Sequence, residues 1–346
     1  MGCPCQQARL RKSRTVRLRW HSAAVRPALK SGLLPVWRDR DTLQIGIDPR
    51  RAVALTGMRQ AAWVVSLLDG SRDRAQVIAA AGQHGINAGT VDRVLMLLAA
   101  GGALDDFPAS TLRALPQAVR AGLAAELATA SLASQDGDGG ARTLARRRAA
   151  RVRIYGAGRV GPAIGEILST SGIGFVAADD LAARTPAAPA GTAGTAGTGR
   201  ARTALPDLAV LTGHHYPELP ASLMSDRVPH LAASASEAIG IVGPLVLPGQ
   251  TACLRCLDFT RTDNDPAWPL ILAQIAGRQP EPAACDAALA AAVAAQAAAL
   301  ALAFIDRASL ADVTANGTLE LVLPAWQWRR RTWLPHPACA CGSNAA

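Results

Sequence analysis

Residues 151–180, RVRIYGAGRVGPAIGEILSTSGIGFVAADD, contain a short β-prone run, a glycine-rich turn, a helix-forming segment and a second strand that ends in acid. This order is typical of the first unit of a nucleotide-binding α/β domain. Gly156 permits the tight turn, Gly158 lets the backbone approach a phosphate, and Gly161 allows close packing of the helix on the strand. Because this spacing alone is weak evidence, the prediction depends on residues farther along the chain.

Two pairs of cysteines lie far apart in the second half of the chain. Cys253 and Cys256 form a C-x-x-C, and Cys339 and Cys341 form a C-x-C near the end. Two close thiol pairs separated by a long segment are typical of a structural tetrathiolate zinc site. A thioredoxin-like redox pair is disfavoured, because the C-x-x-C is not expected to open a helix after a strand. Two alternatives stay open: four unrelated thiols, or His336 in place of one sulfur ligand.

In combination, the glycine turn, the segment GPLVLPGQTACLRCLD at 243–258, the alanine-rich segment at 286–306 and the closing HPACACG resemble the ThiF/MoeB/HesA superfamily. The resemblance covers residues 151–342. It implies an α/β fold with a Rossmann-like domain that binds ATP and adenylates a C-terminal carboxylate. It also implies a zinc clamp and a homodimer.

Some residues that the resemblance assigns to nucleotide binding are present and others are missing. An acid at the end of the second strand holds the ribose in that family, and Asp180 lies at the matching offset, with Asp179 beside it. The family's phosphate-binding lysine has no counterpart, because Lys12 and Lys30 are the only lysines of the chain. Residues 183–203 are a Gly, Thr and Ala repeat, which predicts a disordered insertion where the family has a phosphate-binding arginine.

Three further side chains are candidates for chemistry. His214 and His215 follow the next strand, where the family carries an aspartate for magnesium, and imidazoles are poor ligands for that hard cation. They form either a functional pair at the carboxyl end of a strand or a polar loop. Cys285 is either a thiol whose pKa is lowered by the amino end of the following helix or a small buried residue. The resemblance thus implies ATP and magnesium beside a structural zinc, but the adenylation machinery is incomplete and no catalytic residue is assigned.

Length and charge place these motifs in a two-domain chain. The protein has 346 residues and a net charge of +10, and this length allows two cores of ordinary size. Residues 1–27 are predicted to be a basic disordered arm, and 107–150 a helical, basic linker with solvated arginines. Because no groove-reading helix accompanies these charges, no nucleic-acid partner is expected. The helix at 286–306 is expected to be too weakly hydrophobic for a membrane span, and with no signal peptide the protein is expected in the cytoplasm.

A smaller α+β pattern occupies residues 28–106. Apolar residues alternate around a polar turn, which predicts a β-hairpin, and a third strand follows. Three helical patterns come next, with Ser71 as the expected cap of the second and Gly101 as the stop of the third. These elements predict a winged-helix module. Its strands are expected at 36–38, 43–47 and 52–55, and its helices at 58–68, 71–81 and 88–100.

This module resembles PqqD-like leader-peptide-binding domains in LPVWRDRDTLQIGIDP at 34–49, LLDG at 67–70 and LLAAGGALDD at 97–106. The resemblance implies β-augmentation, in which an extended leader pairs with a strand edge and places apolar side chains against a helix. The same apolar spacing also suits the core of a small domain. The predicted peptide-binding residues are Arg51, Val53, Leu55, Val91, Val94 and Leu95.

Together, the two resemblances imply a role in the biosynthesis of ribosomally made, modified peptides. We expect the small module to capture a precursor leader peptide and a separate YcaO-type cyclodehydratase to be the partner. Two functions stay open for the α/β domain: ATP-dependent adenylation, or presentation of the peptide without turnover. A DNA-binding regulator is a third alternative, because DNA-binding winged helices share the outline of the small module.

Overall fold

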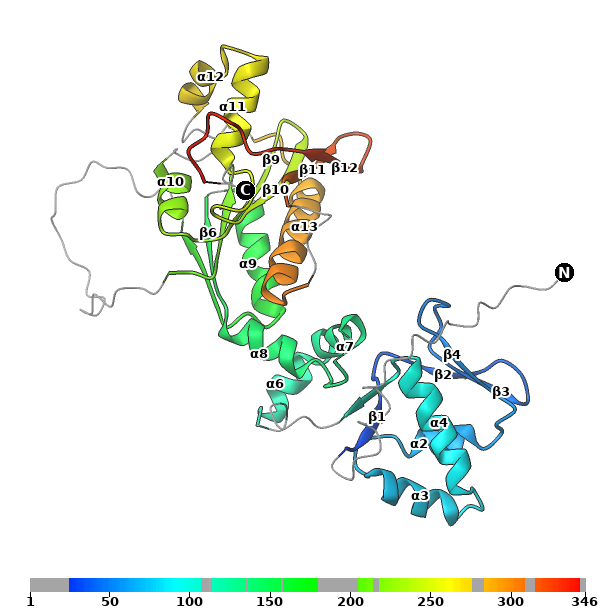
Figure 1. Cartoon of the computed structure of the whole chain (residues 1–346). Coiled ribbons are helices and arrows are strands. Elements are labelled where there is room, and N and C mark those ends of the chain that lie inside the picture. Colours follow the sequence, from blue (N-terminus) through cyan, green and yellow to red (C-terminus); the bar gives the residue numbers. More distant parts are fainter. Residues whose placement is uncertain are drawn as a thin grey trace. The chain divides into compact units, whose positions relative to one another are not determined.

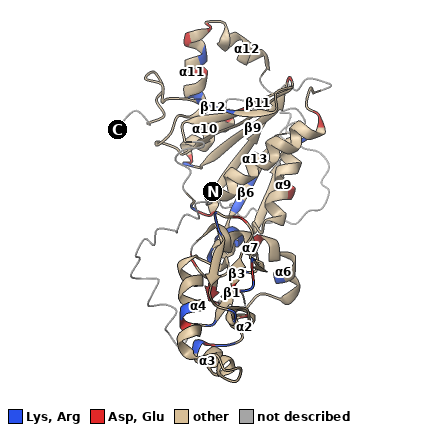
Figure 2. Ribbon diagram, turned by 90° about the vertical axis from the view of Figure 1, so that its right-hand side faces the viewer, with Lys and Arg blue, Asp and Glu red and all other residues tan. Residues whose placement is uncertain are grey.

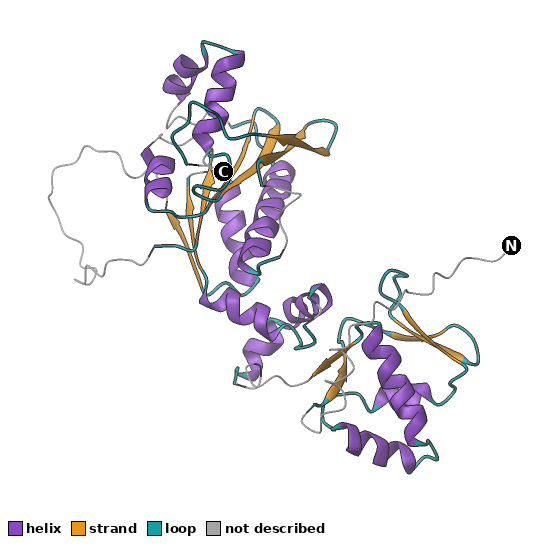
Figure 3. Cartoon of the chain, in the orientation of Figure 1, coloured by secondary structure: helices purple, strands orange, loops and turns teal. Residues whose placement is uncertain are grey.

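The computed structural model divides the chain into two compact units, Met1–Ala145 and Arg146–Ala346. Figure 1 labels the helices and strands of each unit, and Figure 3 separates helices from strands by colour. The basic arm up to residue 24 and the insertion at 183–203 lie outside the described residues. The structure describes residues 25–106, 112, 114–134, 136–156, 158–179, 205–213, 218–275, 283–308 and 315–342.

The first unit contains a three-stranded antiparallel sheet in the order β2-β3-β4. The pairing of Trp37 with Leu43 confirms the predicted hairpin, and the third strand pairs with its second arm. Leu43 and Leu55 are at most 2% exposed, because alternate side chains of the strands point into the core. The strands are β2 (Pro35–Trp37), β3 (Thr42–Ile45) and β4 (Val53–Thr56).

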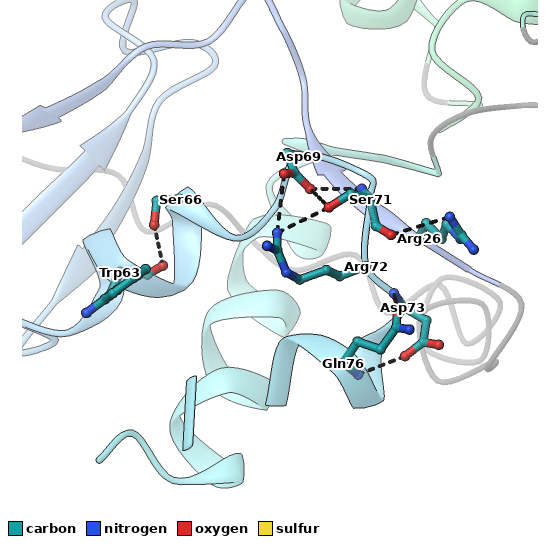
Figure 4. A network of polar contacts seen from close by, with 8 residues as sticks. All are labelled: Arg26, Trp63, Ser66, Asp69, Ser71, Arg72, Asp73 and Gln76. Carbon is teal, nitrogen blue, oxygen red and sulfur yellow. Dashed lines mark hydrogen bonds and ion pairs between the residues drawn. The ribbon is translucent and has the colours of Figure 1, made fainter. Parts of the chain in front are cut away.

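Three helices share the core of this sheet. They are α2 (Ala61–Ser66), α3 (Arg74–Gly82) and α4 (Ala88–Ala100). The bounds of α4 agree with the prediction, whereas α2 is shorter than expected. The predicted cap at Ser71 is wrong: the carboxylate of Asp73 accepts the backbone N–H of Gln76 at 2.8 Å, and the Gln76 side chain accepts the backbone N–H of Asp73 at 3.0 Å. Ser71 instead donates to Asp69, as Figure 4 shows.

A pair of short strands joins the two ends of this module. β1 (Pro27–Leu29) and β5 (Leu104–Asp106) are antiparallel and were not predicted. Beside them the buried ammonium of Lys30 lies 3.6 Å from the Asp105 carboxylate and donates to the carbonyl of Ser131. Since Ser131 belongs to α7 (Ala124–Ala133), which follows α6 (Gln117–Gly122), this contact anchors the predicted linker helices to the first unit.

The second unit is built on a seven-stranded mixed sheet in the order β12-β11-β10-β9-β8-β6-β7. Strands β6 to β9 are parallel, and β10 to β12 are antiparallel to their neighbours. This arrangement confirms the α/β class. The strands are β6 (Arg151–Tyr155), β7 (Phe175–Asp179), β8 (Leu208–Thr212), β9 (His230–Ser236), β10 (Ile239–Val246), β11 (Gly317–Val322) and β12 (Gln327–Thr332).

Helices pack on both faces of this sheet. On one face Ile164 and Val293 share a core with Val210, and on the other Leu223 packs with Leu211. Because successive residues of β8 alternate between the two cores, all of β8 is buried. The described helices of this unit are α9 (Val160–Thr170), α10 (Glu218–Ser225), α11 (Leu254–Asn264), α12 (Trp268–Ile275) and α13 (Ala287–Ile305), and the boundary between the units falls within α8 (Ala141–Ala149).

The alanine-rich segment forms α13, which is long and apolar enough to cross a membrane by length and composition. The expectation that it is too weakly hydrophobic is therefore wrong. Its apolar residues are used in the core, where one face of the helix packs against α9 and the sheet. Contact with β10 is so close that a Cβ on Gly240 would lie 2.4 Å from Cγ2 of Val293.

The arginines before the sheet are not all solvated, which corrects the linker prediction. The side chain of Arg147 is 10% exposed, and its guanidinium donates to the Asp306 carboxylate at 2.7 and 3.0 Å. It also donates to the carbonyl of Ser171 at 3.1 Å. Since Asp306 caps the end of α13, this ion pair ties α13 to the start of the sheet.

A buried histidine begins strand β9. His230 is 0% exposed, and its Nδ1 lies 3.0 Å from the carbonyl of Val228, which accepts its proton. Nε2 has no hydrogen-bond partner in the part of the chain that the structure describes. Burial lowers the pKa of His230, because a charged imidazole loses its hydration there.

We predict that His230→Leu weakens the dependence of stability on pH. Below about pH 6.5 the unfolded chain binds a proton at this histidine that the folded chain does not bind. The free energy of unfolding therefore decreases as the pH is lowered. Between about pH 7.5 and 5.5, urea denaturation should show the unsubstituted protein losing about 1 kcal/mol more than the variant. Equal losses in the two proteins would contradict this prediction.

Candidate metal centre and glycine-rich turn

The C-x-x-C motif lies where the chain passes from β10 to α11. Cys253 is the N-cap of α11, and Cys256 lies in its first turn. The expectation that this motif does not open a helix after a strand is therefore wrong. The redox interpretation still fails, because two further thiols from the end of the chain contact this pair.

The four predicted sulfurs converge on one point. Sγ of Cys253 lies 3.7 Å from that of Cys256 and 3.6 Å from that of Cys339, and Sγ of Cys256 lies 3.6 Å from that of Cys341. All four lie within 4.8 Å of one another. Sulfurs around a tetrahedral zinc, at Zn–S of about 2.3 Å, are about 3.8 Å apart. The cluster therefore fits a metal ion such as zinc, and the alternative of four unrelated thiols is wrong.

The environment of the cluster favours a cation. Cys253, Cys256 and Cys339 are buried, and Cys341 is half-buried. Burial raises the pKa of the Cys253 thiol and raises the pKa of Cys339 to about 11. Without a cation these thiols would keep their protons, because a buried thiolate next to another has no compensating charge. A divalent ion supplies that charge and displaces the protons.

His336 does not replace a sulfur. Its Nε2 lies 2.8 Å from the Asp263 carboxylate, and its Nδ1 accepts the backbone N–H of Ala338 at 3.2 Å. The ring also stacks on Phe259 with centroids 5.1 Å apart. Because both ring nitrogens have partners, His336 orients the segment that carries Cys339.

A buried tryptophan connects the cysteine cluster to the sheet. Trp333 follows β12, packs against the cysteines, and donates its Nε1–H to the hydroxyl of Thr318 at 3.0 Å. The guanidinium of Arg331 lies 4.2 Å from its ring, and that of Arg261 lies 5.3 Å away. Arg261 also lies 4.9 Å from the ring of Trp268. Helices α11 and α12 are therefore joined to β11 and β12 through arginine–aromatic contacts.

The glycine turn lies where β6 separates β7 from β8, at the switch point where open α/β sheets bind ligands. Gly156 has a φ of 121°, and a Cβ there would lie 1.9 Å from the carbonyl oxygen of Thr212 in β8. Gly161 lies close to the same threonine. At Gly158, with a φ of 95°, a Cβ would have no described atom within 4 Å. Gly156 is thus required by strand packing, whereas Gly158 leaves open space at the start of α9.

The structure describes only some of the other residues at the predicted nucleotide site. Asp179 ends β7 opposite Tyr155, and Asp180, His214 and His215 lie outside the described residues. Sequence reasoning missed Arg159, an exposed cation at the N-cap of α9 whose signal was its position inside the glycine motif. Cys285 is half-buried, and desolvation raises the pKa of its thiol, which contradicts the alternative of a lowered pKa.

Most predicted peptide-binding side chains lie in the core of the first unit. Val53 is half-buried, and the guanidinium of Arg51 donates to the carbonyl of Leu132 at 2.5 Å. The remaining four, at most 5% exposed, pack together, as the alternative of core packing expects. They are Leu55, Val91, Val94 and Leu95.

We predict that Cys256→Ser removes bound zinc and lowers the free energy of unfolding by about 3 kcal/mol or more, because loss of a structural metal exposes the whole centre. Cys285→Ser is the matched control and should keep one zinc per chain. Metal analysis of the purified proteins and urea denaturation measure the two effects. Zinc retained by the first variant, or lost from the second, would contradict the four-cysteine site.

Comparison with known proteins supports the fold. No family model and no curated protein matches the chain. The solved structure of the heterocyclase TruD matches with a TM-score of 0.60 and 16% identity, over 92% of this chain and 43% of TruD. E. coli MccB, solved with succinimide, matches with a TM-score of 0.61 and 14% identity, over 92% of this chain and 99% of MccB.

A second structure, the microcin C7 biosynthetic enzyme MccB in complex with N-formylated MccA, matches with a TM-score of 0.58 and 15% identity, over 91% of this chain and 99% of that chain. At these identities the likeness concerns the fold alone. The chain therefore has the fold of TruD and MccB, over less than half the length of TruD and nearly all of MccB.

Proposed function

We propose that this protein binds the leader segment of a ribosomally made precursor peptide and supports heterocycle formation by a separate YcaO-type cyclodehydratase. The match of 92% of this chain to the heterocyclase TruD carries the proposal. More than half the length of TruD has no counterpart among these residues. A peptide ligand is supported by MccB, whose structure contains N-formylated MccA.

The first unit offers a suitable edge for a peptide. Among the described strands, β4 pairs with β3 on one side only, so its other side can add an extended strand. Val53 of β4 is half-buried against the end of α4, where a Cβ on Gly101 would lie 2.2 Å from Cγ2 of Val53. A leader paired with β4 would place alternate side chains over this apolar contact. Val53 is therefore the predicted contact that a peptide reaches without opening the core.

The second unit would act as a zinc-braced platform in this proposal. The resemblance to the ThiF/MoeB/HesA superfamily adds a homodimer to it. Within that platform the metal has a structural role, because all four ligands come from the protein and leave no position for a substrate.

We predict that Val53→Asp weakens leader binding at least tenfold, because a charge replaces the apolar contact beside the β4 edge. Val36→Asp, on the opposite outer strand β2, is the matched control and should bind normally. The measurement is fluorescence anisotropy of the full chain with a labelled precursor peptide. Absence of binding would contradict the proposed function, whereas loss in the control alone would move the site to β2.

Carboxylate adenylation is a second candidate function, favoured by the match to 99% of MccB and by the glycine turn. Among the described residues no side chain caps helix α9, so its first amides and the adjoining Gly158 would be available to a phosphate. Arg159 would supply a cation beside them. No lysine occurs between residues 146 and 346 to neutralise the triphosphate, which weighs against turnover.

Calorimetry with magnesium and ATP tests this second candidate. We predict that Gly158→Ala weakens ATP binding at least tenfold if the turn holds phosphate, while its positive φ costs only about 1–2 kcal/mol of stability. Gly85→Ala, with a φ of 74° and no described atom within 4 Å of its Cβ, is the control for strain. No heat of binding in the unsubstituted protein would remove adenylation and leave peptide presentation.

A further inference from the structure

Strand β12 forms one end of the described seven-stranded sheet (Figure 1). All six of its residues pair with β11 on one side, from Gln327 opposite Val322 to Thr332 opposite Gly317. On its other side no described strand is paired, so its backbone N–H and C=O groups form a free edge. We propose that this edge binds an extended, acidic peptide strand by β-augmentation. The proposal does not depend on leader capture by the first unit.

Two arginines on one face of β12 give the edge its charge preference. Arg329 lies opposite Glu320 and Arg331 opposite Thr318, so the two share a face of the sheet. Both are exposed. Figure 2 colours the lysines and arginines of the described residues blue. Arg329 has no partner among the described residues, and Arg331 is held in place by the ring of Trp333, 4.2 Å away. A strand added at this edge would bring every second side chain next to this pair, where carboxylates are favoured.

Arg330 lies between these two arginines in sequence but does not add its charge to theirs. It points to the opposite face, where its guanidinium donates to the hydroxyl of Thr332 at 2.7 Å and to the carbonyl of Ala315 at 3.1 Å. Its charge is therefore used within the hairpin. The edge thus favours acidic residues at alternate positions over a block of acids.

A second copy of this chain is a poorer occupant. If two β12 strands paired antiparallel through their free edges, the consecutive arginines 329–331 would lie opposite one another, and like charges in that position are destabilising. An acidic strand has the complementary charge. The occupant is therefore a peptide segment of another protein.

The test uses a fluorescein-labelled decapeptide of alternating glutamate and threonine with the full, zinc-loaded chain. Fluorescence anisotropy should show saturable binding that is at least tenfold weaker for a lysine–threonine peptide and for a peptide N-methylated at every second residue. Arg329→Glu with Arg331→Glu should weaken binding about tenfold or more, because two attractions become repulsions. Arg148→Glu with Arg227→Glu, exposed residues elsewhere in the second unit, makes the same charge change and should bind normally.

Three results would overturn the proposal. Equal binding of the acidic and lysine peptides would show that the edge has no charge preference, and unchanged binding in the Arg329 and Arg331 double variant would place the peptide elsewhere. Self-association in sedimentation velocity that this variant abolishes would make a second copy the occupant. Unfolding curves of both double variants check that each remains folded.

Discussion

The convergence of four cysteine sulfurs within 4.8 Å is the constraint on which the second unit depends. It joins the start of α11 to the last described segment of the chain, two regions that are remote in sequence. Burial raises the pKa of Cys253 and Cys339, and a cation among the sulfurs would offset the charge of their thiolates. Trp333 and His336 connect the cluster to the sheet and to α11.

The cysteine cluster and the glycine turn follow strands that run in opposite directions in the same sheet. Val246, which ends β10 before the cysteines, pairs with His230 at the amino end of β9. The glycine turn follows the carboxyl end of β6, and β6 and β9 have the same direction.

Local patterns predicted the parts of the structure whose partners are near in sequence. The strand, turn and helix at 151–180, the hairpin of the first unit and the bounds of α4 follow from periodicity, glycines and short connections. The cysteine pairs succeeded for another reason, since tetrahedral coordination restricts the spacing of thiols. The helix at Cys253 and the cap at Asp73 were missed, because several nearby residues compete for each helix start.

Long-range partners explain the remaining errors. Strands β1 and β5 are too short to be recognised singly, and they form because each completes the other. Arg147 was expected in solvent because nothing near it in sequence reveals Asp306. Burial of α13 and the core positions of Val91 and Val94 likewise depend on elements from other parts of each unit. Which side chains remain free for a peptide or a nucleotide could therefore not be read from periodicity.

X-ray absorption at the zinc edge of the purified protein tests the central claim most directly. A centre built by Cys253, Cys256, Cys339 and Cys341 predicts one shell of four sulfurs at about 2.3 Å, with no nitrogen or oxygen neighbour. A mixed shell of sulfur with nitrogen or oxygen, or a protein that is fully folded without metal, would contradict it.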